Sequence, residues 1–362
     1  MISHGLIGLV RCPDCLGALV LTASAAACQQ CGRQFQSSGG FLDLRPLTAF
    51  EEQTKYLDEA LHADARHESI APPLLGSKIR NDMLRRFLKP GPGDRVLDLG
   101  CGSGRTLTWN RESGAALTGI DIAPYFAPEA VATSDLLLGD LRRLPIKDGT
   151  FSKAWSLDVL EHLSRPALIE MLSQANRVLA PGGALFVYTH VRKNGWPAAG
   201  VRVVNRLARA FERLGLLDLR QERLRKSDHV NPLADHDDLA RVAAESGFRI
   251  ERITYYTPVV GAFVENVLAR MAEQFLARRA LRRQLRAPRA APRGAVRKAS
   301  PAAGDERAGI REARTSAQAR VRKRGPLYWG LMTLSTLMKI DVVLFGRVRS
   351  GPFFALLRKT GA

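Results

Sequence analysis

The nine residues 96–104, VLDLGCGSG, constrain the fold more than any other part of the sequence. The apolar run that ends at Asp98 predicts a strand buried on both faces. Three glycines follow at alternate positions, Gly100, Gly102 and Gly104. Because glycine has no Cβ, it permits positive φ and lets a ligand come close to the backbone. The stretch therefore predicts a strand-to-helix turn that holds a ligand.

The residues downstream predict the fold class. Strands are expected in ALTGIDIAPY, LLLGDLRRLP, FSKAWSLDVLEHL and RVLAPGGALFVYTH, with helices between them. This alternation predicts an α/β fold with a doubly wound parallel sheet. Right-handed crossovers place the carboxyl ends of the strands on one edge. We therefore expect the strand-ending acids to meet there, namely Asp98, Asp121, Asp140 and Asp158.

Two other interpretations of these residues stay open. A dehydrogenase is the main rival for the fold, but its dinucleotide fingerprint needs Gly-x-Gly-x-x-Gly, whereas this chain has Gly-x-Gly-x-Gly followed by Arg105. The Pro-Gly-Gly block before the fifth predicted strand also disfavours it. Single aspartates at strand ends, such as Asp140 or Asp158, can also be helix caps or turn formers.

The series of blocks resembles the class I methyltransferases that use S-adenosylmethionine, in particular the type 11-like subgroup with DVLEH and LAPGG blocks, over about residues 86–190. The resemblance implies a Rossmann-like, mainly parallel, seven-stranded sheet. It implies that Asp98 and the three glycines hold the methionine part of the cofactor and that Asp121 binds the ribose. It places Asp140 beside the adenine and Asp158 near the transferred methyl. The full expected cofactor set is Asp98, Gly100, Cys101, Gly102, Gly104, Asp121, Ile122, Asp140, Leu141 and Asp158.

Four of the five cysteines lie in the first 31 residues, in CPDC and CQQC. Two such pairs, Cys12 with Cys15 and Cys28 with Cys31, predict a structural zinc site in which four thiolates fill the tetrahedron. Two disulfides or a redox CxxC are the competing interpretation. The following CGRQFQSSGGFLDLRP predicts a strand, a Gly-Gly turn and a second strand. This segment resembles the zinc ribbon at the front of some bacterial methyltransferases, including certain rRNA guanine methyltransferases.

Methyl transfer from a sulfonium is an in-line displacement, so much of the catalysis can come from positioning the acceptor. A general base is needed only for a poor nucleophile such as a hydroxyl. The candidate catalytic residues are His229, His162 and Glu161, and His229 is preferred because its segment resembles the one that closes over the acceptor. His190 and His236 are further candidates, although His236 or Asp235 could instead cap the helix in HDDLARVAAESGF.

The formal net charge of +19 is concentrated in one stretch. Residues 278–324 carry sixteen Lys or Arg against three acids, which gives +13. Such a polycation could bind RNA phosphates, bind anionic lipid or act as a solvated linker. It has no interleaved aromatics, which weakens the RNA interpretation. Residues 199–226 predict another basic amphipathic helix or helix pair.

The expected domains are a zinc ribbon at 1–46, a helical linker at 47–85, the methyltransferase core at 86–260, a helical and Arg-rich insertion at 261–345 and a final strand at 346–362. The resemblance places the antiparallel seventh strand at 353–359. The apolar stretch 327–338 stays uncharged for about 12 residues, short of the ~20 that a bilayer span needs. No secretory signal is visible. We therefore expect a cytoplasmic protein or one that touches a membrane surface.

The expected activity is methyl transfer from S-adenosylmethionine to oxygen or nitrogen of a small-molecule, sugar-linked or lipid-linked acceptor. The alternative is an RNA base methyltransferase, of the rRNA type, that uses the zinc ribbon and the basic insertion to bind RNA. A third hypothesis is a binding module with a vestigial cofactor site. The acids and glycines of the expected cofactor site are all present, which disfavours this third hypothesis. The sequence does not predict the acceptor or the oligomeric state.

Overall fold

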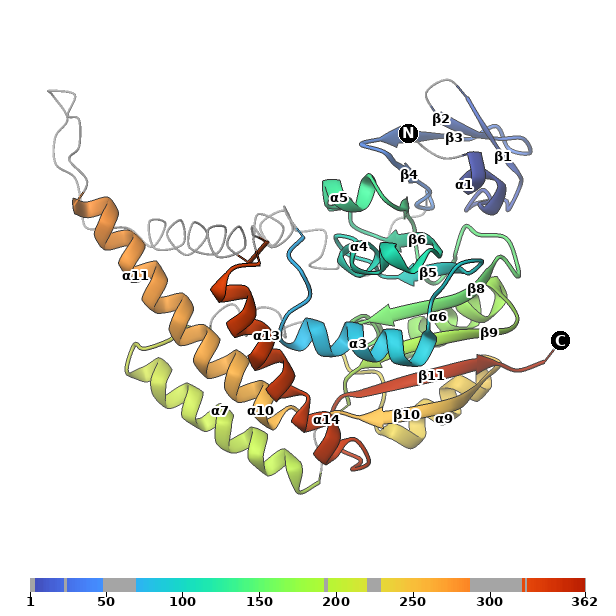
Figure 1. Cartoon of the computed structure of the whole chain (residues 1–362). Helices are drawn as coiled ribbons and strands as arrows, with labels where there is room; N and C mark the ends of the chain where they lie inside the picture. Colours follow the sequence, from blue (N-terminus) through green and yellow to red (C-terminus); the bar gives the residue numbers. More distant parts are fainter. Residues whose placement is uncertain are drawn as a thin grey trace, which may run out of the picture.

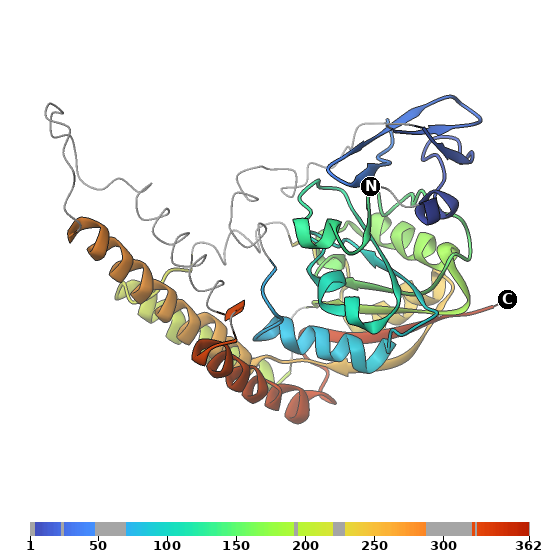
Figure 2. The same ribbon diagram turned by 45° about the horizontal axis from the view of Figure 1, so that its top comes forward.

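The computed structural model describes residues 4–22, 25–47, 70–191, 195–219, 229–286, 321–322 and 324–361. Within these residues, one sheet of eleven strands runs through the molecule in the order β1-β2-β3-β4-β7-β6-β5-β8-β9-β11-β10 (Figure 1). Helices cover both faces of its central part (Figures 1 and 2).

Seven of these strands form the expected doubly wound core. In sheet order they are β7 (Asp135–Leu138), β6 (Ala116–Asp121), β5 (Arg95–Leu99), β8 (Phe151–Leu157), β9 (Leu179–Thr189), β11 (Phe353–Lys359) and β10 (Phe248–Tyr255). The first five strands in this order pair in parallel, and β11 lies antiparallel between β9 and β10. The antiparallel final strand at 353–359 is confirmed. The strand order reverses beside β5, and ligands bind at such switch points in open α/β sheets.

The expectation of seven strands is wrong for the sheet as a whole, because the N-terminal segment extends it. This segment contains α1 (His4–Leu9), β1 (Leu19–Leu21), β2 (Ala25–Cys28), β3 (Gln34–Ser38) and β4 (Phe41–Asp43). The β3–β4 hairpin confirms the predicted Gly-Gly turn. β4 pairs in parallel with β7, with Leu42 opposite Leu137. Without β4, β7 would be an edge strand with unpaired backbone groups, so the N-terminal segment completes the sheet.

The two faces of the sheet carry separate apolar cores. One face packs on α6 (Arg165–Val178) and α9 (His236–Glu245) and buries Leu97 and Leu99 of β5. The other face packs on α3, α4 and α5 and buries Val96. Neighbouring residues of β5 therefore point to opposite cores, as a strand buried on both sides requires. The bounds of the remaining core helices are α3 (Gly76–Leu88), α4 (Arg105–Asn110), η2 (Arg111–Ser113), α5 (Pro128–Val131) and η3 (Leu160–His162).

A group of helices extends away from the sheet, beginning beside β10 and β11 (Figures 1 and 2). We call this group the helical arm. It consists of α7 (Pro197–Arg213), α10 (Val259–Ala262), the π-helix η4 (Phe263–Ala269), α11 (Arg270–Arg286), α13 (Pro326–Met338) and α14 (Ile340–Phe345). Most of the expected Arg-rich segment 278–324 and much of the expected linker 47–85 lie outside the described residues.

The last two helices of the arm correct one expectation from the sequence. Residues Pro326–Phe345 form a 20-residue helical stretch that is long and apolar enough to cross a membrane by length and composition. The sequence estimate stopped at Met338 because charges follow. Both charges have partners, since Lys339 pairs with Asp82 at 2.6 Å and Asp341 accepts from the start of α10.

Candidate active site

The glycine turn after β5 is shaped by the absence of side chains. All three glycines have positive φ, at 78° for Gly100, 53° for Gly102 and 78° for Gly104. A Cβ on Gly100 would lie 2.5 Å from Val159, and one on Gly104 would lie 2.4 Å from the Cβ of Ala130. A Cβ on Gly102 would meet nothing within 4 Å. Packing therefore requires the outer two glycines, whereas the middle one leaves its backbone open to a ligand.

The end of β6 fixes this turn. The Asp121 carboxylate accepts hydrogen bonds from the backbone N–H of Gly102 at 2.7 Å and of Ala123 at 3.0 Å. The Ile120 carbonyl accepts from the N–H groups of Gly100 and Cys101. Asp121 is only partly buried, so its carboxylate lies between the turn and the open edge of the sheet.

Asp98 is the most unusual acid of the site. Its side chain is 2% exposed, and its Oδ2 has no hydrogen-bond partner among the described residues. Burial, with the nearby charge of Asp121, raises the pKa of Asp98 to about 7. The nearby Trp155 side chain offsets this burial only in part, and a buried carboxylate oxygen without a close donor is costly, so this position favours a proton or a cationic ligand.

The other expected cofactor residues differ in their burial and in their hydrogen-bond partners. Asp140 is engaged by Arg142, whose Nη2 lies 2.9 Å from its Oδ2 and whose N–H donates to its Oδ1. This local pairing matches the turn-forming interpretation of a single aspartate. Cys101 is buried in the core, as a small packing residue would be. Ile122 and Leu141 are half-buried beside Asp121 and Asp140 along the chain.

Asp158 follows β8 in a left-handed conformation, with φ 57°. Its N–H donates to the Tyr188 carbonyl at 3.1 Å, and its carboxylate lies 3.4 Å from Nε of Arg80 on α3. A non-glycine residue with positive φ is uncommon, and such backbone strain gathers at functional sites. Arg80 was not predicted, because one of several basic residues on an amphipathic helix gives no signal of its distant partner.

Glu161 lies at the centre of a buried polar group. Its side chain is 1% exposed, and it accepts from Thr189 Oγ1 and pairs with His190 Nδ1, both at 2.8 Å. Burial opposes ionisation, but the bonds from His190 and Thr189 outweigh it and lower the pKa of Glu161. With Nδ1–H donating to Glu161, Nε2 is the His190 nitrogen that can take up a proton. Thr189 was not predicted, because its contact spans 28 residues.

The structure brings the predicted catalytic residues together. The rings of His162 and His229 meet edge to face at 4.8 Å, and His229 lies 5.9 Å from the His190 ring. The Glu161 carbonyl accepts from Val230 N–H at 2.8 Å and thereby holds the segment that carries His229. Ligand atoms of Glu161, His162 and His229 lie within 4.8 Å of one another, as do those of Asp158, Glu161 and His190.

These groups have the ligand types of a divalent-ion site, but the hydrogen bonds favour proton transfer. Both oxygens of Glu161 already accept, one from Thr189 and one from His190. A metal would have to displace these donors from a carboxylate that is 1% exposed. The arrangement is instead that of a buried acid that orients an imidazole.

Two further candidates have structural roles. Asp235 caps α9 by accepting from the N–H of Asp238 at 2.7 Å. His236 packs edge to face on Tyr255 and Phe353, and its Nε2 lies 3.3 Å from the Gly351 carbonyl. Burial in this aromatic surrounding lowers the pKa of His236. We therefore drop His236 as a catalytic candidate.

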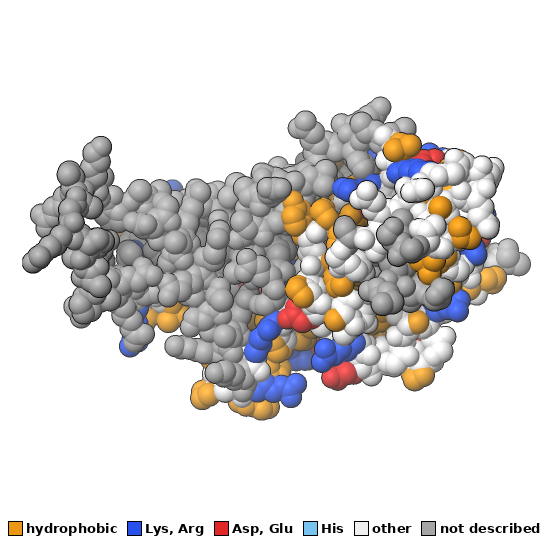
Figure 3. Space-filling model, turned by 90° about the horizontal axis from the view of Figure 1, so that it is seen from above, with side chains coloured by type: hydrophobic (Ala, Val, Ile, Leu, Met, Phe, Trp, Pro, Cys, Tyr) orange, Lys and Arg blue, Asp and Glu red, His pale blue; other side chains and the backbone are white. Residues whose placement is uncertain are grey.

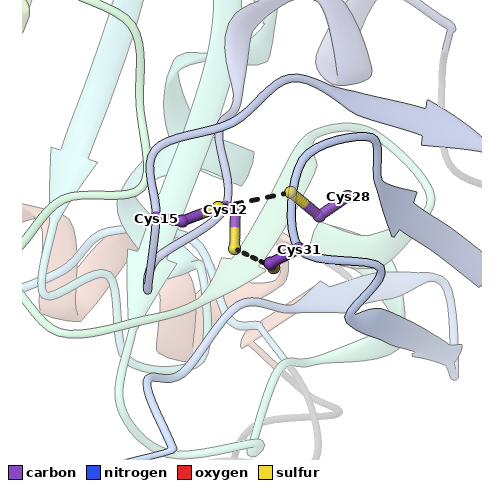
Figure 4. A group of neighbouring side chains, drawn as sticks. All are labelled: Cys12, Cys15, Cys28 and Cys31. Carbon is purple, nitrogen blue, oxygen red and sulfur yellow. Dashed lines mark hydrogen bonds between the residues drawn. The ribbon is translucent and has the colours of Figure 1, made fainter.

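The four N-terminal cysteines converge, as Figure 4 shows. Sγ of Cys12 lies 3.8 Å from that of Cys31, and Sγ of Cys15 lies 3.4 Å from that of Cys28. All four thiols are free in this arrangement, and both sulfur distances are longer than the about 2.05 Å of a disulfide bond. Zn–S bonds of about 2.3 Å place the sulfurs of a tetrahedral site about 3.8 Å apart. The spacing thus fits zinc.

The two cysteine turns have the same backbone form. Leu16 N–H donates to the Cys12 carbonyl at 2.9 Å, and Gly32 N–H donates to the Cys28 carbonyl at 3.1 Å. Leu16 and Gly32 both have positive φ, at 62° and 73°. Gln30 N–H also points to Sγ of Cys28 at 3.4 Å. This repeat is the pair of turns that the CxxC spacing predicts.

Comparison with known proteins agrees with this arrangement. Residues 97–187 match a family described as a methyltransferase domain. The chain is 32% identical over 109 residues to a sterol 4-C-methyltransferase of Caenorhabditis elegans, which covers 28% of this chain and 32% of the relative. It is 32% identical over 117 residues to a malonyl-[acyl-carrier protein] O-methyltransferase of Serratia marcescens, covering 31% of this chain and 45% of the relative.

A solved structure of Haemonchus contortus phosphoethanolamine N-methyltransferase 2 with S-adenosyl-L-methionine aligns at a TM-score of 0.48 and 16% identity, over 86% of this chain and 59% of that chain. The sequence matches cover between 32% and 51% of the length of the first curated relatives. The segment that matches the family model, residues 97–187, contains the glycine turn, Asp98, Asp121 and Asp158. Residues 97–187, in the central part of this chain, are therefore a methyltransferase domain.

Proposed function

We propose that this protein transfers a methyl group from S-adenosylmethionine to a hydroxyl or amine of a small-molecule or lipid-linked acceptor. The observation that carries the proposal is the meeting of two arrangements at one edge of the sheet. One is the open glycine turn between Asp98 and Asp121. The other is the Glu161–His190 pair, which can accept a proton. An RNA acceptor is the alternative that the experiment below distinguishes.

The residues of the turn fit the proposed cofactor. The unpartnered Oδ2 of Asp98 suits the positively charged ammonium of the methionine part, which would relieve a buried charge. The open backbone at Gly102 gives room for the same part. The Asp121 carboxylate at the end of β6 is placed to accept hydrogen bonds from ribose hydroxyls. Asp140 and Leu141 would border the adenine, and Asp158 would line the side of the acceptor.

When bound, S-adenosylmethionine supplies a methyl group on a sulfonium, which is ready for displacement. The chain's own residues then hold the acceptor and manage its proton. His190 Nε2 takes the proton from the acceptor hydroxyl or ammonium, and Glu161 holds the ring and stabilises its charged form. Glu161 is thus a positioning residue, and His190 replaces His229 as the preferred base. His229 and His162 border the same space.

The raised pKa of Asp98 predicts how cofactor binding depends on pH. Below about pH 7 the buried carboxyl of the free protein is protonated, and pairing with an ammonium requires its ionised form. We expect affinity for S-adenosylmethionine to rise up to about tenfold per pH unit between pH 5.5 and 7, with release of a proton, and then to level off. Calorimetry in buffers of different ionisation enthalpy measures both quantities.

Asp98→Asn is the matched control for this titration. The variant should bind more weakly at pH 7.5 and show no pH dependence between 5.5 and 7. Affinity of the native chain that is constant over this range would contradict the assigned role of Asp98.

The catalytic pair predicts the outcome of a labelling experiment. The full chain is incubated with methyl-labelled S-adenosylmethionine and a fractionated cell extract. We expect label in the small-molecule or lipid fraction, and label in RNA would favour the alternative acceptor. His190→Ala should lower the rate at least ~10²-fold, because the base is lost, while cofactor affinity stays unchanged. Glu161→Gln should lower the rate less and alter the pH profile, because it changes the orientation and basicity of the imidazole.

His229→Ala is the comparison variant, since its ring lies in the same cluster. A rate that falls with His229→Ala but not with His190→Ala would overturn the assignment in favour of His229. The label transfer itself, with the native chain, tests the wider proposal.

For the N-terminal cluster, we propose one structural zinc ion held by Cys12, Cys15, Cys28 and Cys31. The sulfur spacing and the repeated turns support it. Buried residues of the ribbon such as Phe35 and Leu42 belong to the same apolar cluster as one face of the sheet, and the metal would add folding free energy to that packing.

The zinc site predicts a defined metal content. Purified protein should contain one zinc per chain, and Cys28→Ser should reduce it to well below one and lower the unfolding temperature. Cys101→Ser should leave the zinc content at one, because Cys101 lies in the glycine turn. Elemental analysis with thermal unfolding makes the comparison. One zinc per chain in Cys28→Ser would refute the assigned ligands.

A further inference from the structure

We infer that the helical arm is a membrane-binding surface, which lies on an anionic bilayer with apolar side chains at the acyl boundary and arginines among the headgroups. The inference concerns residues outside the methyl-transfer site and does not depend on the proposed acceptor. It rests on three observations: two exposed apolar stripes, the side chains that hold the opposite face of α13 and α14 on the protein, and the distribution of charge.

The first stripe runs along α13 and α14. Exposed residues recur there at helical spacing, and apart from Gly330, Thr333 and Thr336 they are apolar. The one basic side chain of Pro326–Phe345, Lys339, pairs with Asp82. Val343 is 81% exposed, Leu344 62%, Trp329 61% and Leu337 47%. At the lower edge of Figure 3, over these helices, hydrophobic side chains stand at the surface next to Lys and Arg side chains. Soluble proteins rarely leave such a large apolar stripe uncovered.

The opposite side of the same helices is fixed to the protein. Ser335, Met338 and Asp341 are fully buried. The Ser335 hydroxyl accepts from the Leu75 N–H at 2.7 Å, and the Asp341 carboxylate accepts from the N–H of Gly261 at 2.7 Å. Because one side of these helices is held on the protein, only the opposite, exposed side is available to lipid, which favours an orientation in the plane of the bilayer interface.

The second stripe lies on α7. Ala199, Val203, Leu207, Ala210 and Leu214 are exposed at spacings of four, four, three and four residues. Val203 is 62% exposed and Leu214 70%. Because these spacings follow the helical repeat, the five side chains line one face.

A row of arginines borders this second stripe. Arg202, Arg206, Arg209 and Arg213 are all exposed and repeat at four, three and four residues, next to the apolar row. Long basic side chains beside an apolar face are the pattern of an interfacial helix, because their stems lie along apolar surface while their charges reach phosphates.

The two stripes meet at an aromatic contact. Trp196, 69% exposed at the start of α7, packs edge to face on Phe345 at the end of α14, with ring centroids 5.5 Å apart. Tryptophan favours the membrane–water boundary, because it has both an apolar body and a polar N–H. Among the described residues, fifteen of the nineteen exposed large hydrophobic side chains lie on the helical arm or within three residues of α7.

The charge favours lipid over a second copy of this chain. In a symmetric dimer through this surface, the same patch occurs on both partners. The exposed residues of α7 include no acid, so the row Arg202 to Arg213 would meet no opposite charge from the same helix of the second copy, which is unfavourable at an interface. An anionic bilayer offers phosphates to the arginines and an apolar interior to the stripes at the same time.

The test uses the full chain and vesicles of phosphatidylcholine, with or without about 30% phosphatidylglycerol. Flotation should show at least tenfold stronger binding to the anionic vesicles at low salt. Val343→Glu with Leu344→Glu should reduce binding at least tenfold to both kinds of vesicle. Arg206→Glu with Arg209→Glu should remove the preference for anionic vesicles. Leu47→Glu is the matched control, because Leu47 is 77% exposed outside the arm and its replacement should change nothing.

Unfolding temperature and cofactor affinity, measured for every variant, show that each is folded. Failure of the native chain to float overturns the inference, as does a Val343→Glu/Leu344→Glu variant that floats like the native chain. Concentration-dependent dimers that this variant dissolves would assign the surface to a second copy instead. Protein that resists alkaline carbonate extraction would show a spanning helix and likewise contradict a surface-lying arm.

Discussion

The packing around two glycines determines where chemistry can occur in this molecule. Gly100 and Gly104 have no room for a Cβ, since Val159 and Ala130 press against them. This close packing turns the chain sharply after β5 and leaves the backbone of Gly102 open between Asp98 and Asp121. The cofactor pocket that we propose is thus a consequence of how β5, β6 and α5 fit together.

The acceptor side depends on a different kind of constraint, a buried charge. Glu161 is almost completely shielded from water, and its two oxygens are satisfied by Thr189 and His190 from the end of β9. The carbonyl of the same residue holds the segment that carries His229. Glu161 therefore orients the proposed base, His190, and holds the segment that carries His229. The contacts with Thr189 and His190 form because the ends of β8 and β9 lie side by side.

How much the sequence could predict follows from the range of each interaction. The glycine turn, the strand-ending acids and the cysteine pairs are local patterns, and the structure places each where the pattern indicates. The pairing of β4 with β7 was not predicted, because Leu42 and Leu137 are far apart in the chain and the sequence around each gives no sign of its partner. Arg80 beside Asp158 and Thr189 beside Glu161 were missed for the same reason.

The arm shows a second limit of sequence patterns. Sequence patterns predicted an amphipathic helix or helix pair at 199–226 and a helical insertion at 261–345, but they could not tell which face of each helix the protein covers. Asp341 looked like the end of an apolar segment, whereas the fold buries it against the start of α10. Whether an apolar side chain belongs to a core or to an exposed stripe depends on packing that only the three-dimensional structure shows.

The central claim is that the edge between β5 and β6 binds S-adenosylmethionine through Asp121. Equilibrium binding of the cofactor to the folded native chain, Asp121→Ala and Glu112→Ala tests it most directly, with the exposed Glu112 as control. We predict one site per chain, at least ~10-fold weaker binding for Asp121→Ala from loss of charged hydrogen bonds, and no change for Glu112→Ala. Absence of binding to the native chain, or equal binding by Asp121→Ala, would contradict the account.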